Sequence, residues 1–79
     1  MQRTFSFSKA LELLKEGRKV ARNGWNGKGL WIEMQRPDAY SKMTLPYLYL
    51  NYPQGQRVPW LASQTDLICE DWYEVKNEH

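Results

Sequence analysis

The first regular pattern along the chain predicts a helix over residues 7–16. Apolar residues recur there at spacings of three and four, which places them on one helical face. Ser6 precedes this face and can cap the helix by accepting a bond from a first-turn N–H, and Gly17 can take the left-handed conformation that ends it. The predicted face consists of Phe7, Ala10, Leu11 and Leu14.

Beyond Gly17 the period of the pattern changes to two, which is typical of strands. Residues 18–22 and 30–35 alternate in this way, and two Asn-Gly pairs with a further glycine predict a tight loop between them at 23–29. The two strands therefore predict a hairpin. Residues 37–46, with a proline at each end, predict a connecting loop.

The second half of the chain begins with another predicted hairpin. Tyrosine, leucine and asparagine alternate over residues 47–51, and the turn Pro53-Gln54-Gly55 sends the chain back through residues 57–60. The turn residues are those that β-turns favour. We therefore expect these two segments to pair.

A short helix and a last strand complete the predicted elements. Ser63 and Asp66 have the spacing of a capping box, with Asp in place of Glu, and predict a helix ending at Ile68 or Cys69. Residues 72–76 alternate again and predict a strand. The sequence thus predicts the α+β class: a mostly antiparallel sheet of about five strands, an N-terminal helix and a short second helix.

The length of 79 residues predicts one domain over residues 1–79. A core of this size contributes only about 3 to 5 kcal/mol. The single cysteine and the terminal histidine cannot supply a disulfide or a metal site, so we expect a homo-oligomer without metal or cofactor. No apolar stretch nears the roughly 20 residues that span a bilayer, and no secretory signal is visible, so we expect a cytosolic protein.

Charge is distributed unevenly along the chain, although the net charge is only +2. Residues 1–28 carry a net charge of +5, and residues 59–79 carry −4. Two interpretations stay open: the two ends attract each other or lie on solvated faces, or the basic first third attracts a small anion. The modest total argues against a protein that wraps a long nucleic acid.

Most enzyme templates do not fit the sequence. The run Gly24–Gly29 is too short for a phosphate loop and does not open a helix. A nucleophilic triad cannot be assembled because the only histidine is terminal. Asp66, Glu70 and Asp71 could serve as general acid and base, but acidic residues on and after a short helix are usually solvated. We expect no enzyme and no catalytic residues, with hydrolysis as an alternative.

Aromatic side chains are the more informative feature, because 11 of the 79 residues are Phe, Tyr or Trp. Trp25 lies in the glycine-rich loop, where no strand packs it. Either its ring folds back onto the core or another subunit, or it forms a stacking platform for a purine. We assign the strand aromatics to the core or to a subunit interface: Trp31, Tyr47, Tyr49, Trp72 and Tyr73.

The segment from Val58 to Asp66 offers a second candidate. A helix start exposes backbone N–H groups with partial positive charge, and here hydroxyl and amide side chains surround it, which suits phosphate or ribose. The alternative is that Ser63 caps the helix and the other polar side chains face solvent. We expect Trp25 and this segment to meet.

Taken together, these motifs resemble the second Thoeris anti-defence family, small proteins of phages and their bacterial hosts. The resemblance runs from Phe7 to Val75, and the chain departs from the pattern mainly in its short middle, residues 35–46. The motifs that carry it are Phe7, Ala10-Leu11, Leu14-Lys15, Gly17, the run from Lys19 to Lys28, Pro46-Tyr47-Leu48-Tyr49, the run from Val58 to Asp66, and Glu70-Asp71-Trp72.

The resemblance implies a sponge: a homotetramer in the cytoplasm of the infected host that binds the glycocyclic ADP-ribose of Thoeris immunity without cleaving it. It implies that some members also hold cyclic dinucleotides of the CBASS system in separate pockets. Trp25 and Asn26 would grip adenine or ribose, and Arg22 and Lys28 would favour the pyrophosphate. The implied ligand-binding set, completed by a neighbouring subunit, is Arg22, Trp25, Asn26, Gly27, Lys28, Trp60, Ser63, Gln64, Thr65 and Asp66.

Two other functions remain alternatives beside hydrolysis. The same aromatics and the basic first third also suit a small single-stranded nucleic-acid binder, whose affinity would fall steeply with salt. An interaction module with no ligand would bind no nucleotide. We expect neither DNA or RNA nor a membrane as partner.

Overall fold

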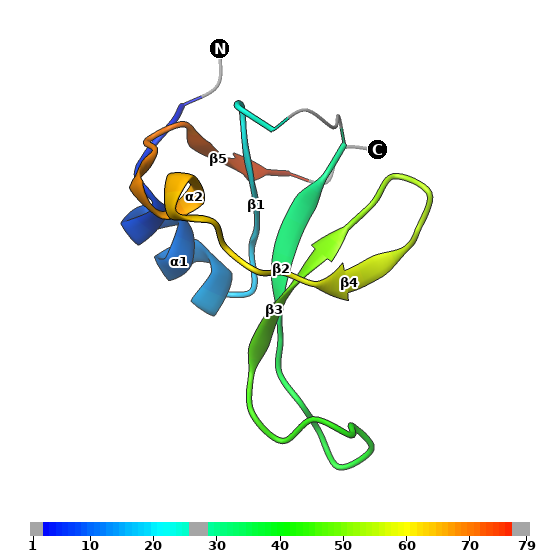
Figure 1. The fold of residues 1–79 in the computed structure, drawn as a ribbon. Coiled ribbons are helices and arrows are strands. Elements are labelled where there is room, and N and C mark those ends of the chain that lie inside the picture. The colour runs from blue at the N-terminus through cyan, green and yellow to red at the C-terminus, as the bar shows by residue number, and fades with distance from the viewer. Residues whose placement is uncertain (1–2, 26–28, 77–79) are drawn as a thin grey trace.

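A five-stranded antiparallel sheet with the order β4-β3-β2-β1-β5 forms the framework of the protein (Figure 1). The structure is a computed structural model that describes residues 3–25 and 29–76. It confirms the predicted α+β class, and the element ends differ from the predicted ones by at most one residue. The elements are α1 (Phe7–Lys15), β1 (Lys19–Arg22), β2 (Trp31–Gln35), β3 (Tyr47–Asn51), β4 (Arg57–Pro59), α2 (Gln64–Ile68) and β5 (Trp72–Val75).

Both predicted hairpins are present in the sheet. β1 pairs with β2 through the register Val20 to Ile32, and β3 pairs with both β2 and β4. The return of the last strand was not predicted: β5 runs back beside β1, on the side away from β2. Phe5 adds an isolated bridge to Trp72. The two ends of the described chain therefore lie side by side.

The caps of α1 are those that the sequence predicts. The hydroxyl of Ser6 accepts a bond from the N–H of Lys9, and Gly17 has a φ of +88° directly after the helix. The buried face is wider than predicted, because it includes Leu13 beside Ala10 and Leu14. α1 contacts β1, β2, β5 and α2, so neighbouring elements cover more than one side of the helix.

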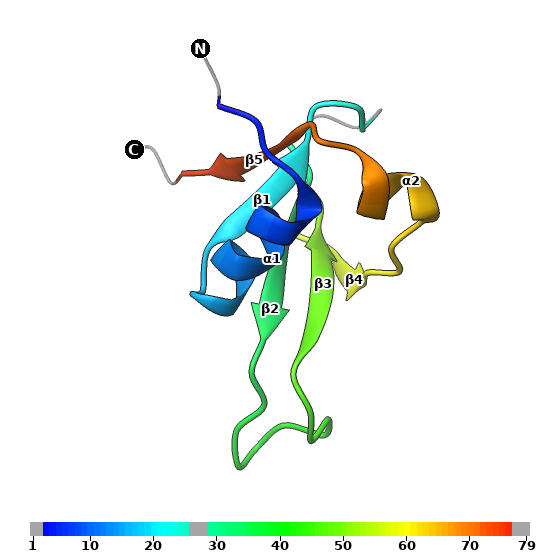
Figure 2. The same ribbon diagram turned by 90° about the vertical axis from the view of Figure 1, so that its left-hand side faces the viewer.

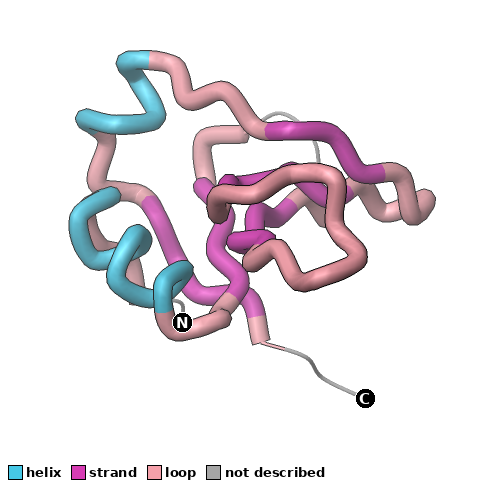
Figure 3. The backbone as a smooth tube through the Cα atoms, turned by 90° about the horizontal axis from the view of Figure 1, so that it is seen from below, coloured by secondary structure: helices cyan, strands magenta, loops and turns pink. Residues whose placement is uncertain are grey.

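Both helices lie on one side of the sheet (Figures 2 and 3). The core between them and the strands consists of Ala10, Leu13, Leu14, Val20, Ile32 and Trp72. Trp72 is fully buried, and its ring lies 5.1 Å from Phe7, 5.4 Å from Trp25 and 5.9 Å from Trp60, measured between centroids. Of the strand aromatics assigned to the core or an interface, Trp72 therefore belongs to the core.

The opposite face of the sheet carries polar and aromatic side chains. Strand register places Trp31, Asn51 and Arg57 side by side there. Glu33 accepts bonds from Trp31 and Asn51, and Asn51 accepts one from Arg57. A pocket of about 140 Å³ lies beside this network, lined by Gln35, Tyr47, Tyr49, Arg57, Val58 and Pro59.

The segment between β2 and β3 extends away from the sheet (Figure 1). Near its tip the carboxylate of Asp38 accepts bonds from Tyr40 and Ser41, which closes a local turn. Large apolar side chains are exposed here, Tyr40 at 96% of its surface and Leu45 at 75%. The prediction of a connecting loop is confirmed. Within residues 3–25 and 29–76, no helix is long and apolar enough to cross a bilayer.

Candidate ligand-binding site

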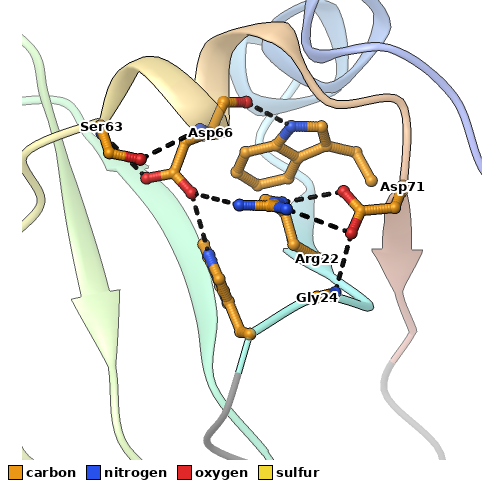
Figure 4. A network of polar contacts seen from close by, with 7 residues as sticks. Arg22, Gly24, Ser63, Asp66 and Asp71 are labelled. Carbon is orange, nitrogen blue, oxygen red and sulfur yellow. Dashed lines mark hydrogen bonds and ion pairs between the residues drawn. The ribbon is translucent and has the colours of Figure 1, made fainter.

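Arg22 lies at the end of β1 with only 9% of its side chain exposed. Its Nε donates a 2.8 Å bond to Oδ1 of Asp71, and a second nitrogen, Nη2, reaches Oδ2 of the same carboxylate at 3.3 Å. The remaining nitrogen, Nη1, donates a 2.7 Å bond to Oδ1 of Asp66 (Figure 4). The guanidinium is thus held between two carboxylates, with the forked geometry that arginine favours.

Asp66 joins this arginine to the start of α2. Its Oδ2 accepts the N–H of Ser63 at 2.9 Å, and its own N–H donates a 3.0 Å bond to the hydroxyl of Ser63, which forms the predicted capping box. Its Oδ1 accepts from Arg22 and, at 3.1 Å, from the indole Nε1 of Trp25. Its main-chain oxygen accepts the indole N–H of Trp72 at 2.8 Å. One residue therefore connects α2, β1 and both indoles.

Asp71 fixes the turn that follows β1. Its Oδ2 accepts the backbone N–H of Gly24 at 2.8 Å, and its main-chain oxygen accepts the N–H of Asn23 at 3.1 Å. A Cβ on Gly24 would lie 2.8 Å from both Arg22 Nη2 and Asp71 Oδ2. The absence of a side chain at Gly24 thus allows the arginine and the carboxylate to approach the backbone.

All three charged groups are stabilised in their ionised forms. The hydrogen bond from Arg22 lowers the pKa of Asp71 below its ordinary value, and that bond also raises the pKa of Arg22. Burial opposes ionisation of Asp66, but bonds from Ser63, Arg22 and Trp25 outweigh it and lower its pKa. The network of Arg22, Asp66 and Asp71 therefore carries a formal charge of −1.

Ion pairs between the two ends of the chain explain the uneven distribution of charge along the sequence. Arg22 pairs with Asp66 and Asp71, and Arg18 pairs with Glu74 through a 3.0 Å contact. The interpretation that the basic first third and the acidic last third attract each other is confirmed. The same pairs account for two of the basic residues that could have attracted an anion.

Trp25 is half-buried and packs on the core cluster. Its ring lies edge-on to Trp72 and 6.5 Å from Trp60, measured between centroids. The loop tryptophan thus folds back onto the core, and because its side chain is only partly buried, this packing and a stacking role do not exclude each other. The ring also meets the segment from Val58 to Asp66, as expected, and it does so within one chain.

The structure thus brings together five of the ten residues in the implied ligand-binding set: Arg22, Trp25, Trp60, Ser63 and Asp66. Gln64 and Thr65 lie exposed on the first turn of α2. Asn26, Gly27 and Lys28 lie outside the described residues. The sequence analysis considered Asp71 only as an acid or base, and no local signal marks it as the partner of an arginine 49 positions away.

The geometry argues against Asp66 and Asp71 as general acids. A general acid must hold a proton near neutral pH, whereas the pKa values of Asp66 and Asp71 are both lowered. Both carboxylates are also occupied by internal donors. Among the described residues, no group of three or more His, Cys, Asp or Glu side chains could hold a metal ion.

Comparison with known proteins identifies the family of the chain. Residues 5–75 match the model of the Thoeris anti-defense 2-like domain. The chain is also similar to the protein named Thoeris anti-defense 2 from Bacillus phage SP01, with 35% identity over 85 residues, covering 91% of this chain and 96% of the relative. The matched residues include the helix, the glycine-rich loop, α2 and Asp71. The chain therefore belongs to the Thoeris anti-defense 2-like family.

Proposed function

We propose that this protein is a phage inhibitor of Thoeris immunity that binds the glycocyclic ADP-ribose signal and holds it without cleaving it. Family membership and the name of the phage relative support the anti-defence role. The lowered pKa values of Asp66 and Asp71 argue against either residue as the general acid of a hydrolysis. The inhibitor would act in the cytoplasm of the infected host, where the signal is made.

The observation that carries the proposal is the meeting of Trp25 with the segment that contains Trp60 and Asp66. Trp25 is bonded to Asp66 and lies 6.5 Å from Trp60, so two indoles from distant parts of the chain share one surface. Both side chains are half-buried, so part of each remains exposed to solvent. Stacking on aromatic side chains contributes about 1 to 3 kcal/mol per base.

The remaining affinity would come from polar contacts around these rings. A sponge needs a nanomolar Kd, or about −12 kcal/mol. Gln64 and Thr65 are exposed on α2 and offer amide and hydroxyl groups to ribose. Lys28 stays the predicted partner of the pyrophosphate. Ser63 and Asp66 remain predicted contacts, although the capping box already uses them.

A homotetramer is part of the proposal. The aliphatic side chains of Leu61 and Ile68 are exposed at 92% and 75% of their surfaces, and Leu67 is half-exposed at 50%. A group of exposed aliphatic residues on and beside α2 suits a subunit contact. Such a contact would supplement the small core and would let a second chain complete the ligand site.

The decisive experiment separates sequestration from hydrolysis. The protein is mixed with glycocyclic ADP-ribose, heat-denatured, and the supernatant is analysed by chromatography. We expect the intact signal to be recovered, and recovery of cleaved product would establish hydrolysis instead.

Calorimetry against glycocyclic ADP-ribose, a cyclic dinucleotide and a short oligonucleotide distinguishes the ligand classes. Tight binding of the oligonucleotide alone, weakening steeply with salt, would favour the nucleic-acid alternative. No heat with any of them would favour an interaction module. Trp25→Ala should abolish binding of the signal and leave the oligomer intact, whereas Tyr40→Ala, on the exposed loop between β2 and β3, should bind normally.

A further inference from the structure

The position of Arg22 suggests a role different from the one that the sequence suggested. Three donor nitrogens of its guanidinium, Nε, Nη1 and Nη2, already donate to Asp66 or Asp71, at distances of 2.7 to 3.3 Å. These bonds use three of the five guanidinium N–H groups, and only 9% of the side chain is exposed, so an anionic ligand has little access to the guanidinium. It would also meet a network whose formal charge is −1. Arg22 is therefore poorly placed to attract a pyrophosphate directly.

The same bonds connect three separate parts of the chain around the proposed site. Arg22 belongs to β1, Asp66 to α2, and Asp71 to the segment between α2 and β5. In Figure 4 the guanidinium lies between the two carboxylates, with Gly24 beside Asp71. Removing any one of these charges would free the others to move. The network thus determines how the start of the glycine loop lies relative to α2.

The network also holds the ring that the proposed function requires. Asp71 accepts the backbone N–H of Gly24, and Asp66 accepts the indole N–H of Trp25. Two consecutive residues of the loop are thus each held by one of the two carboxylates. A hydrogen bond from the N–H of Trp25 to the main-chain oxygen of Arg22 closes the turn. The orientation of Trp25 is therefore fixed from its backbone and from its indole nitrogen at once.

We infer that Arg22, together with Asp71, is a positioning residue that fixes Gly24 and Trp25 for ligand stacking and does not itself contact the ligand. The expected effect on ligand affinity rests on the proposed function. The way in which Arg22 and Asp71 hold Gly24 and Trp25 does not depend on any ligand. The opposing hypothesis, in which Arg22 contacts the pyrophosphate, predicts a different effect of Asp71→Asn on ligand affinity.

The test compares Asp71→Asn with Glu74→Gln. Both variants neutralise one carboxylate that pairs with an arginine, but Glu74 pairs with the half-exposed Arg18 away from Trp25. If Arg22 positions Trp25, Asp71→Asn weakens binding of glycocyclic ADP-ribose at least tenfold and Glu74→Gln leaves it unchanged. If Arg22 contacts the pyrophosphate, Asp71→Asn leaves the affinity equal or higher, because a competing carboxylate is gone. That result would overturn the inference.

Arg22→Lys provides a second variant that retains the positive charge. A lysine ammonium cannot bridge two carboxylates with a planar fork. Positioning predicts that Arg22→Lys loses affinity as Asp71→Asn does, whereas a contact that depends on charge alone would retain most of the affinity. Retained affinity in Arg22→Lys would also contradict the inference.

A readout without ligand separates this inference from the proposed function. The tryptophans are replaced by 5-fluorotryptophan, and the Trp25 resonance is assigned by its absence in Trp25→Phe. We expect the fluorine resonance of Trp25 to shift or broaden in Asp71→Asn and to stay in place in Glu74→Gln. An unchanged resonance in Asp71→Asn would refute the positioning role, even if the wild-type protein bound no nucleotide at all.

Discussion

The indole Nε1 of Trp25 donates a 3.1 Å hydrogen bond to Oδ1 of Asp66, across 41 positions of sequence. The bond joins the glycine-rich loop to the first turn of α2. The carboxylate that accepts it also caps the helix and pairs with Arg22. Trp25 is therefore tied to an acidic residue that also connects α2 with β1.

Trp25→Phe should reduce the free energy of unfolding by about 1 kcal/mol, the usual contribution of one hydrogen bond. The ring remains to pack on Trp72, while the donor to Asp66 is lost. Urea unfolding followed by circular dichroism measures the change. Tyr40→Phe, at a side chain that is 96% exposed, serves as the control and should unfold as the wild type does. Equal stability of the two variants would mean that the indole bond contributes nothing.

Asp66→Asn should lower the free energy of unfolding further, by about 3 kcal/mol, because a buried arginine then loses one of its two carboxylates. The side-chain exposure of this pair is only 9% and 10%, so water cannot replace the lost partner. The matched control is Glu12→Gln, which breaks the exposed pair between Lys9 and Glu12. Such surface pairs contribute about 0 to 1 kcal/mol. Thermal or urea unfolding that ranks the two variants equally would contradict this prediction.

Stability should fall when the pH drops below about 4. The pKa values of Asp66 and Asp71 are lowered in the folded protein from 3.8, so the unfolded chain binds more protons between the lowered values and 3.8. The free energy of unfolding therefore rises with pH through that window. The stabilisation is fully present above the unfolded value and is lost as pH falls through the folded values. Unfolding curves between pH 2 and 7 measure it, and the slope should be shallower in Asp66→Asn.

Gly24→Ala should disturb the network of Arg22, Asp66 and Asp71 more than a substitution at a glycine with open space. A Cβ on Gly24 would lie 2.8 Å from atoms of Arg22 and Asp71, which their mutual bonds hold in place. Gly17→Ala meets no atom within 4 Å and suffers only the strain of its φ of +88°. That strain amounts to about 1 to 2 kcal/mol. Only Gly24→Ala should alter the fluorine resonance of Trp25.

The hydroxyl of Tyr49 should lose its proton at a higher pH than the hydroxyl of a free tyrosine. Burial raises the pKa of its hydroxyl above 10.0, and the negative charge of Glu33 adds to the effect. Absorbance at 295 nm during an alkaline titration measures tyrosinate. Tyr49→Phe should remove a component of the absorbance that develops at high pH. If Tyr49→Phe removes absorbance that develops at or below pH 10, the predicted direction is wrong.

The local part of this fold could be predicted from sequence because its determinants lie within a few residues of one another. Ser6, Gly17 and the Ser63–Asp66 box act on their own helices, and the period of two marks each strand. The return of β5 to β1 has no local signal. Its cause is the burial of Trp72, which requires α1, β1 and the distant Phe5 together.

The candidate site was predictable only as a set of segments. Spacing and residue type indicated Trp25 and the start of α2, but not the bonds between them. Arg22 illustrates the reason. The family resemblance implied a pyrophosphate as the partner of Arg22, while its partners within the chain, Asp66 and Asp71, stand 44 and 49 positions away. Charge balance between distant segments identifies an attraction but not which atoms meet.

The pairing of β1 with β5 has a kinetic consequence. Forming it closes a loop of about 50 residues, and the entropy of that closure must be paid before Trp72 is buried. Contacts so distant in sequence slow the search for the native topology. The core and the contacts of Arg22 then arise in one cooperative step. A chain in which β5 has not yet paired with β1 lacks the bonds between Arg22 and Asp71, and so lacks the surface proposed for a nucleotide.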